Sequence, residues 1–290
     1  MKWLKKNKLF LILLLPAVLI LGAVVVYPMC SAFHSSMFKF SLAKPYMGKH
    51  FNWLNNYLEL FQSLRFWKSF IKTLIYTISA VWAEIIIGFI IARLLVYKIR
   101  GIVIYKTIVA IPIFLAQVVV GYVWKFMLNV DFGFLNSIIS SVGLKPISFL
   151  GSRNLALLTI IMVDIWQHTP FPLLLFLAAF TNLPKAPFEA AKIDGANIIQ
   201  TIRYITIPLL KPVILMAIVI RSYDVFKTFD KIYVLTGGGP AKASEVLTVM
   251  LYKIAFVEHN TGVATALSWI MLLVSMLIVI FYVRILGKNK

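Results

Sequence analysis

Six long apolar segments dominate this sequence, at residues 9–33, 70–97, 102–127, 154–180, 213–235 and 261–286. A helix of about 20 apolar residues spans the roughly 30 Å hydrocarbon core of a bilayer. Strands of a membrane barrel instead alternate apolar and polar residues over about ten positions, which these unbroken runs do not. Only 13% of the residues are charged, about half the share of a soluble domain. We therefore predict an all-α polytopic membrane protein with six transmembrane helices.

The first segment resembles a secretory signal because four of residues 1–8 are lysines and an apolar run follows. A signal core is about 7–15 residues long and ends at small residues. Here the run is longer and leads into Tyr27-Pro28-Met29-Cys30. The segment is predicted to be an uncleaved anchor.

The formal net charge of +19 would suit a nucleic-acid partner, but the basic residues lie mainly beside the apolar segments. This placement favours charges that set topology and face lipid headgroups. With both termini inside, the inner segments hold 15 Lys and Arg residues and the outer ones 9. The positive-inside rule then places both termini in the cytoplasm.

Metal and disulfide sites are not expected. The single Cys30 excludes an intrachain disulfide and a cysteine zinc cluster. The four histidines, at positions 34, 50, 168 and 259, show no metal-ligand spacing.

Residues 181–212 form a polar stretch inside the membrane-protein pattern. Pro184 and Pro187 end the preceding helix, and Pro187 suits the first turn of a new one. Glu189 then lies in that first turn, where a carboxylate is favoured by the helix dipole. A second short helix is predicted from isoleucines at 198, 202 and 205, and we expect Pro208 and Pro212 to stop it. An amphipathic helix lying among lipid headgroups would have a similar composition.

The spacing within this stretch is more specific. Glu189-Ala190-Ala191 is followed after three residues by Gly195, and after nine more by Ile205-Thr206-Ile207-Pro208. This resembles the EAA loop of type I ATP-binding-cassette (ABC) importer permeases, whose pattern ends Ile-x-Leu-Pro. Ile207 in place of Leu is the only departure. The resemblance implies the type I importer permease fold.

The resemblance also implies roles for individual residues. The loop would be the coupling helix that lies in a cleft of the ATPase subunit. Glu189 would pair with a basic group there, while Ala190, Ala191 and Gly195 would allow close approach. Asp194 would fix the turn between the two short helices, and Pro208 would end the pattern.

Three further motifs resemble those of the carbohydrate branch of these importers, which includes maltose, glycerol-3-phosphate and raffinose-type permeases. It comprises Thr-Gly-Gly-Gly-Pro at 236–240, Tyr-Lys-Ile-Ala-Phe at 252–256 and Gly-Val-Ala-Thr-Ala at 262–266. The glycine run lacks the Gly-Lys-Ser/Thr of a phosphate-binding loop, so we interpret it as a turn. Residues 70–290 would form the permease core domain, and residues 1–69 an anchor helix with an outer loop.

The resemblance finally implies an assembly. The partners would be a homologous second permease, two ATPase subunits and an extracytoplasmic solute-binding protein, in a bacterial plasma membrane. No ATPase motif is found in the chain, so this protein is not expected to be an enzyme. It is expected to hold no cofactor, with ATP and Mg²⁺ bound by the partner ATPase.

The fifth apolar segment carries charges three residues apart, which are Arg221, Asp224, Lys227 and Asp230, with Lys231 beside the last. Each charge near the bilayer centre costs about 2.5–3.5 kcal/mol. One interpretation is an alternating ladder whose charges neutralise one another. The other is a hydrated path in which at least one of Asp224, Lys227 or Thr228 contacts the solute.

The fourth segment offers aromatic and polar groups around two prolines, at 170 and 172, that should bend it. Trp166 and Phe171 would stack on sugar rings, and Gln167 or His168 would supply hydrogen bonds. Core packing around a kink is the alternative.

Glu84, in the second segment, is another intramembrane charge, and we expect it to pair with a basic group on another helix. Two other classes of protein use such residues. An intramembrane enzyme would combine Asp164, His168 and Asp224, and a proton-coupled carrier would use Glu84 and Asp224. Neither explains the loop at 181–212.

The charge balance suggests the cargo. The fifth segment holds three basic and two acidic residues, and the first outer loop holds five basic residues against Glu59. Such an excess would concentrate an anionic solute. We therefore hypothesise an acidic carbohydrate such as a uronate oligosaccharide. Alternatively, the extra charge offsets acidic residues of the partner permease or contacts anionic lipid.

Overall fold

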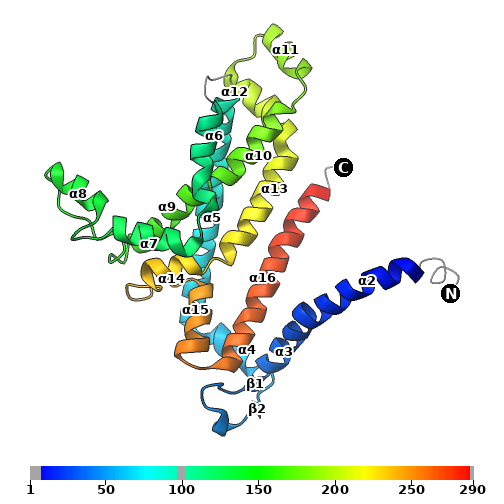
Figure 1. Ribbon diagram of the computed structural model, residues 1–290, viewed down its shortest axis with the longest axis vertical. Coiled ribbons are helices and arrows are strands. Elements are labelled where there is room, and N and C mark those ends of the chain that lie inside the picture. The colour runs from blue at the N-terminus through cyan, green and yellow to red at the C-terminus, as the bar shows by residue number, and fades with distance from the viewer. Residues whose placement is uncertain (1–7, 97–101, 288–290) are drawn as a thin grey trace. The chain divides into compact units, whose positions relative to one another are not determined.

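The computed structural model describes residues 8–96 and 102–287 and is built almost entirely of helices (Figure 1). Some residues of the sequence predictions lie outside the described residues. They are residue 97 of the predicted second span and seven of the basic residues counted for the orientation, Lys2, Lys5, Lys6, Lys98, Arg100, Lys288 and Lys290. The elements in chain order are α2 (Lys8–Leu21), η1 (Gly22–Val26), α3 (Tyr27–Ser36), β1 (Phe38–Lys39), η2 (Pro45–Met47), β2 (His50–Phe51), α4 (Asn55–Gln62), α5 (Leu64–Leu95), α6 (Ile102–Ala110), η3 (Ile111–Phe114), α7 (Gln117–Met127), α8 (Phe134–Ser141), α9 (Ala156–His168), α10 (Pro170–Thr181), α11 (Ala186–Ile193), α12 (Ile198–Thr201), η4 (Ile202–Thr206), α13 (Ile207–Phe226), α14 (Asp230–Thr236), α15 (Leu247–Tyr252), η5 (Lys253–Val257) and α16 (Thr261–Gly287).

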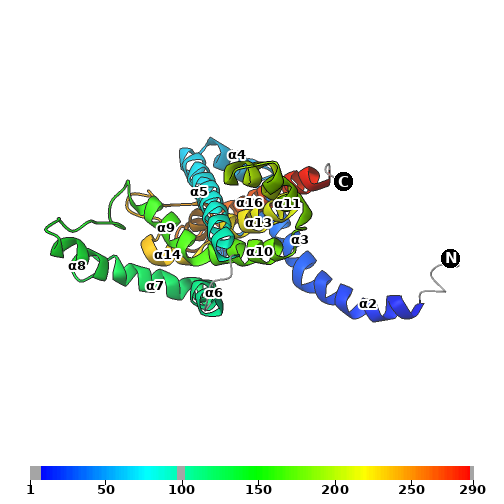
Figure 2. The same ribbon diagram turned by 90° about the horizontal axis from the view of Figure 1, so that it is seen from above.

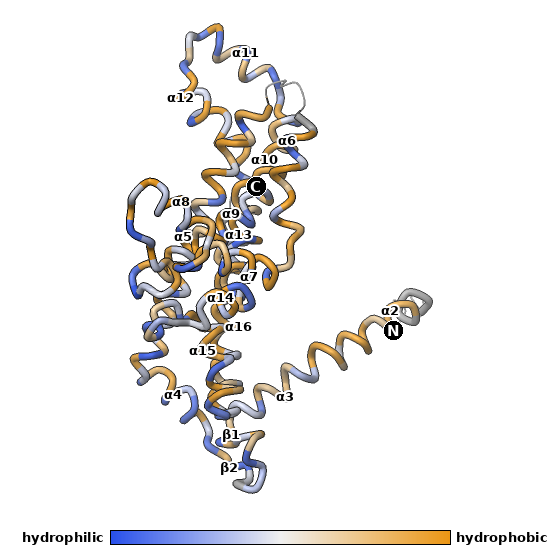
Figure 3. The backbone as a smooth tube through the Cα atoms, turned by 60° about the vertical axis from the view of Figure 1, so that its left-hand side comes forward, coloured by the Kyte–Doolittle hydropathy of each residue, from blue (hydrophilic) through white to orange (hydrophobic). Residues whose placement is uncertain are grey.

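The predicted membrane spans are present. Within the described residues, five helices are long and apolar enough to cross a bilayer, at Leu13–Ser36, Leu64–Leu95, Ala156–Thr181, Ile198–Phe226 and Thr261–Tyr282. A bent pair, Ile104–Phe114 and Gln117–Met127, makes a sixth span if it is counted as one. The all-α polytopic class is therefore confirmed. The hydropathy colouring in Figure 3 shows a largely apolar α2, whereas the α11–α12 segment mixes polar and apolar residues.

The third span is not the single helix that was predicted for residues 102–127. Its two halves meet at an angle of 98°, and Figure 2 shows α6 seen nearly end-on where α7 runs across the view. Pro112 lies in the 3₁₀ turn η3, and Leu115 and Ala116 that follow have extended backbones. A proline lacks the N–H that would continue the helix. The break therefore leaves backbone groups near Leu115 that need other partners.

The fifth span also differs from the prediction of residues 213–235. The helix begins at Ile198 and runs through Pro208 and Pro212 to Phe226, so the expected stop at the prolines is wrong. The π-helical turn η4 (Ile202–Thr206) precedes Pro208, and such a turn changes which carbonyls need a donor. After a three-residue link, Asp230–Thr236 form a separate short helix, α14.

Two compact units divide the chain. The first contains residues 1–67 and 251–273. In its described part, β1 pairs with β2 in an antiparallel register that sets Phe38 opposite Phe51. The Asn56 amide donates to the carbonyls of Ser36 (2.7 Å) and Phe38 (3.0 Å). Gly262 lies so close to the Phe38 carbonyl that a Cβ atom would stand 2.1 Å from its oxygen.

The second unit contains residues 68–250 and 274–290 and holds the main apolar core. Tyr76, Ile160, Phe176 and Leu210 are among its fully buried side chains and come from α5, α9, α10 and α13. Within this unit α14 runs beside α7 (Figure 1). Gly121 permits the approach, because a Cβ there would lie 2.9 Å from the Val234 side chain.

Candidate functional site

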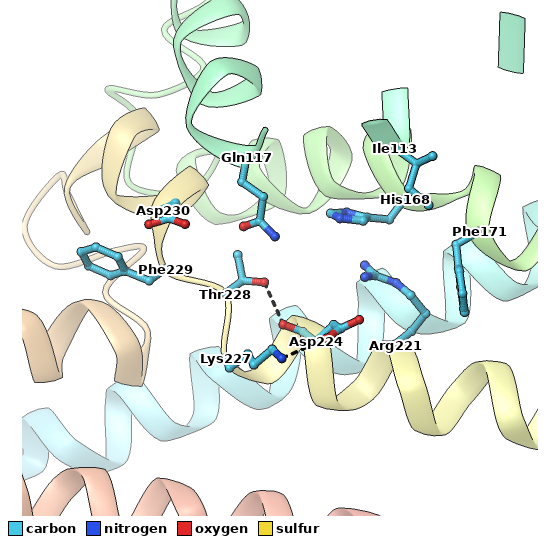
Figure 4. Close-up of a pocket in the computed structure, with 10 residues that line it drawn as sticks. All are labelled: Ile113, Gln117, His168, Phe171, Arg221, Asp224, Lys227, Thr228, Phe229 and Asp230. Carbon is cyan, nitrogen blue, oxygen red and sulfur yellow. Dashed lines mark hydrogen bonds and ion pairs between the residues drawn. The ribbon is translucent and has the colours of Figure 1, made fainter. Parts of the chain in front are cut away.

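A polar cavity of about 490 Å³ lies in the second unit, next to the end of α13 (Figure 4). Two interrupted spans and one continuous helix border it: the bend between α6 and α7, the α13–α14 link, and the fourth span around the α9–α10 junction. The lining residues are Ile113, Gln117, His168, Phe171, Arg221, Asp224, Lys227, Thr228, Phe229 and Asp230.

The α13–α14 link is held open by hydrogen bonds of Thr228. Its hydroxyl donates to the Asp224 carbonyl (3.0 Å), and its own carbonyl accepts from the Thr248 hydroxyl (2.7 Å). Lys227 Nζ lies 3.2 Å from Asp224 Oδ1, and both side chains are about half exposed (55% and 42%). The cavity is therefore bordered by groups that donate and accept hydrogen bonds.

Behind the cavity Arg221 forms a bidentate ion pair with Glu84 of α5. Its Nε and Nη2 atoms donate to the two carboxylate oxygens at 2.7 and 2.9 Å. The Arg221 side chain is 5% exposed and that of Glu84 is fully buried. Planar two-point pairing of this kind is the strongest that arginine makes with a carboxylate. The basic partner expected for Glu84 is thus Arg221.

A second buried pair adjoins the first. Lys231 Nζ of α14 binds the Asp164 carboxylate of α9 and the Gln167 side-chain oxygen, the latter at 2.9 Å. His168 Nδ1 lies 2.8 Å from Asp164 Oδ1, and Arg221 Nη2 is 3.7 Å from Asp164 Oδ2. The two pairs therefore form one network that joins α5, α9, α13 and α14.

The network also supplies a hydrogen-bond donor to the backbone at the bend of the third span. The Gln167 amide donates to the Leu115 carbonyl (3.0 Å), which lies in the break before α7. An unpaired backbone carbonyl in a water-free interior would cost several kcal/mol. Gln167 thus contacts both Lys231 and the bent span.

The alternating ladder expected along the fifth segment is only partly present. Lys227 and Asp224 pair as it required, but Arg221 reaches Glu84 and Asp164 on other helices. Lys231, at the end of the series, is fully buried against Asp164. Because the helix ends at Phe226, residues 230 and 231 begin a new helix axis rather than a further turn of the same face.

Five of the seven residues predicted for a substrate path line the cavity, and these are His168, Phe171, Asp224, Lys227 and Thr228. The other two lie elsewhere. Gln167 is buried in the charge network, and Trp166 packs edge-on against Trp124 with ring centroids 5.4 Å apart. Ile113, Gln117 and Phe229 also line the cavity but were not predicted from the sequence. They reach the cavity because the third and fifth spans are interrupted. For Ile113 and Gln117, the nearby Pro112 could have indicated the bend in the third span.

Three potential metal ligands, Glu84, Asp164 and His168, lie within 4.8 Å of one another. Both carboxylates already bind cationic side chains in the described structure. A divalent cation would have to displace Arg221 and Lys231, so this cluster suits an ion-pair network rather than a metal.

The polar segment at 181–212 forms a helix–turn–helix. Pro187 and Glu189 lie in the first turn of α11, as predicted. Gly195 has a left-handed backbone (φ +73°), and the amides of Ala196 and Gly195 bond the carbonyls of Ala191 (2.9 Å) and Lys192 (3.3 Å). This is the Schellman arrangement that ends helices at a glycine.

The helix after the turn starts with a capping box. The Asn197 side chain accepts from the Gln200 amide (2.9 Å), and the Gln200 side chain accepts from the Asn197 amide (2.8 Å). Apolar side chains are exposed around this turn, including Ile193 (86%), Ile198 and Ile199. An exposed apolar patch of this kind is typical of a surface that contacts a protein or a membrane.

The apolar spans and the polar cavity between them favour an integral membrane protein that transports a solute. The chain belongs to the family of binding-protein-dependent transport system inner membrane components, which matches residues 64–289. Membership confirms the resemblance seen in residues 189–208 and makes the protein an inner-membrane permease subunit of an ABC importer. Proteins of this family work with a second permease and with separate ATPase subunits, so the chain is not itself an enzyme.

Individual relatives agree. A probable ABC transporter permease protein of Sinorhizobium fredii is 36% identical over 256 residues, which cover 88% of this chain and 82% of the relative. The trehalose/maltose transport system permease protein MalF of Thermococcus litoralis is 32% identical over 287 residues, 97% and 94% of the two chains.

A solved structure shares the fold. It is a chain of a bacterial ABC transporter involved in the import of the acidic polysaccharide alginate, with a TM-score of 0.84 and 23% identity. The match covers 99% of this chain and 98% of that one.

Replacing buried Lys231 by methionine should destabilise the protein by about 3–5 kcal/mol, because Asp164 then loses its closest cation. The exposed Lys227→Met variant is the matched control and should cost about 0–1 kcal/mol. Thermal unfolding of both variants in detergent measures the difference. Equal unfolding midpoints would show that Lys231 contributes no more than a surface lysine.

Proposed function

We propose that this permease subunit forms the path for a carbohydrate, and that the cavity at the α13–α14 link contacts the solute. The observation that carries the proposal is the lining, in which Gln117, Thr228, Asp224 and Asp230 offer hydrogen bonds between two aromatic rings. Hydroxyl groups need directional partners, and a site built to satisfy them rejects solutes that lack them.

The aromatic residues support the same class of solute. Phe171 and Phe229 lie at opposite ends of the lining in Figure 4, with the polar side chains between them. Pockets for small molecules combine apolar walls with a few polar groups that fix orientation. Sugar rings present C–H faces to such walls and hydroxyls to such groups.

Names of relatives support a sugar as well. Besides the trehalose/maltose permease, they include a sulfoquinovosyl glycerol permease of Agrobacterium fabrum and a multiple sugar-binding transport permease of Streptococcus mutans. The solute would be delivered by an extracytoplasmic binding protein, a component named for a transporter of the same fold.

The hypothesis of an acidic carbohydrate started from an excess of basic residues along the fifth segment and in the first outer loop, of which only the former reaches the cavity. Around the cavity Arg221, Lys227 and Lys231 stand against Glu84, Asp164, Asp224 and Asp230. The excess is thus reversed once the partners from α5 and α9 are counted. We therefore propose a neutral sugar or oligosaccharide as the main cargo.

We further propose that the α11–α12 turn docks on an ATPase subunit, which binds ATP and Mg²⁺. Glu189 would pair with a basic group there, and Ala190, Ala191 and Gly195 would allow close approach, with Pro208 beyond the contact. Backbone hydrogen bonds and the Asn197 side chain close the described turn. We propose that Asp194, which was expected to fix this turn, contributes as the residue next to Gly195. This segment and both termini would then lie in the cytoplasm.

Removal of one carboxylate from the cavity tests the path. The complete importer, reconstituted with its binding protein, should take up labelled neutral di- or oligosaccharides. Asp224→Asn should lower this uptake about tenfold or more, the effect of losing a charged hydrogen-bond acceptor. Asp131→Asn, which changes an exposed acid beyond α7, is the control. Uptake that Asp224→Asn leaves unchanged would remove the cavity from the path.

A charge at the turn tests the coupling. Gly195→Asp places a carboxylate at the proposed contact and should abolish uptake while the protein still inserts, since an unpaired charge in an interface costs several kcal/mol. Gly143 is the matched control, because it also has a left-handed backbone (φ +80°) with open space around its Cβ position. Gly143→Asp should transport normally. If both variants transport, the docking proposal fails.

Cysteine labelling tests the orientation. In a Cys30→Ser background, Lys242→Cys should react with an impermeant thiol reagent added outside intact cells. Lys192→Cys should react only after the membrane is opened. The opposite pattern would place the α11–α12 turn outside and separate it from ATP.

A further inference from the structure

Arg221 lines the cavity, but its charge is paired with Glu84, a buried residue that does not line the cavity. Its guanidinium donates two hydrogen bonds to Glu84, at 2.7 and 2.9 Å, and Glu84 is fully buried. In Figure 4 the Arg221 side chain extends between His168 and Phe171 at the cavity wall. A charge paired in this way acts on the cavity as one end of a dipole, whose field falls faster with distance than that of a single charge.

The other cations near the cavity are paired too. Lys227 lies 3.2 Å from Asp224, and Lys231 binds Asp164. Asp230 adds a further exposed carboxylate to the lining. Among these described groups the acidic residues outnumber the basic ones by one. The acids are Glu84, Asp164, Asp224 and Asp230, and the bases are Arg221, Lys227 and Lys231. Without the charge of Glu84 the two numbers would be equal.

We propose that Glu84 determines the charge selectivity of the transport path, although it is too deeply buried to touch the solute. By neutralising Arg221 it prevents the cavity from holding an anion, and leaves carboxylate and amide groups to accept bonds from uncharged hydroxyls. Glu84 is thus a positioning residue that acts through Arg221. The inference deepens the proposed carbohydrate function by assigning the path to neutral solutes.

The proposal predicts what the loss of one carboxylate does. In Glu84→Gln the side chain keeps its size and still accepts one hydrogen bond, but the negative charge is gone. Arg221 then keeps only the Asp164 carboxylate as a counter-charge, 3.7 Å away and shared with Lys231, so the wall becomes more positive by one charge in a cleft that concentrates ions. Anions should become enriched in the cavity and cations depleted.

The local potential is measured with a cysteine that lines the cavity. Gln117→Cys in a Cys30→Ser background provides the target in the full importer, in membranes opened so that reagents reach both sides. Two methanethiosulfonate reagents of similar size are compared, one with a trimethylammonium group and one with a sulfonate group. The ratio of their rates reports charge, because any change in access alters both rates together.

We expect Glu84→Gln to lower the cation-to-anion rate ratio about tenfold, within the range by which charged clefts concentrate ions. Asp131→Asn removes one exposed acid four residues beyond the end of α7, a helix about 16 Å long that begins at Gln117, and should leave the ratio unchanged. The double variant Glu84→Gln/Arg221→Gln removes both charges and should restore the ratio of the parent.

An unchanged ratio in Glu84→Gln, with normal reactivity of the cysteine, would overturn the proposal. A double variant that stays as low as the single one would do the same, because the shift would then not come from Arg221. The measurement uses no sugar. Its failure is therefore distinct from a failure of the carbohydrate function, which the uptake assay tests separately.

Discussion

The buried network of Glu84, Arg221, Asp164 and Lys231 is the constraint on which the second unit depends. Each of these charges costs about 2.5–3.5 kcal/mol near the centre of a bilayer, so the helices that carry them must place opposite charges together. The pairs found here join α5 with α13 and α9 with α14. Removing one partner of a buried pair costs more than removing both, which makes the arrangement specific. The network thus selects which helices are neighbours, a task that apolar side chains in lipid perform less well.

The same network accounts for two interrupted spans, the third and the fifth. A proline bend in the third span leaves the Leu115 carbonyl free, and Gln167 satisfies it while also binding Lys231. The end of α13 at Phe226 lets Lys231 turn back into the interior on a new helix. Residues at both interruptions line the cavity. Stability and the solute path therefore draw on the same residues, with Arg221 belonging to both.

Much of this fold was predictable from the sequence, because apolar runs determine spans and the Glu-Ala-Ala spacing is nearly unique to one family. The first span, and the last to within one residue of its end, followed from hydropathy. The bend at Pro112 and the helix that continues through Pro208 did not, because a proline breaks or merely bends a helix according to its neighbours. At the site, His168 and Phe171 in the fourth segment, and Asp224 and Thr228 in the fifth, were found because polar and aromatic residues stand out within an apolar span. Glu84 and Arg221 are 137 positions apart in the sequence. A local sequence pattern does not predict a contact over such a separation. Gln117 was missed for the same reason, since only the bend brings it to the cavity.

The contact between Glu84 and Arg221 is the central claim about the second unit, and a double-mutant cycle tests it most directly. Glu84→Gln alone and Arg221→Gln alone each leave one buried charge without its partner, so each should lower the unfolding midpoint of the protein in detergent. The double variant Glu84→Gln/Arg221→Gln removes both charges of the pair, so it should be destabilised by clearly less than the sum of the two single effects. Single effects that simply add in the double variant would show that the two residues do not pair, and would contradict the claim.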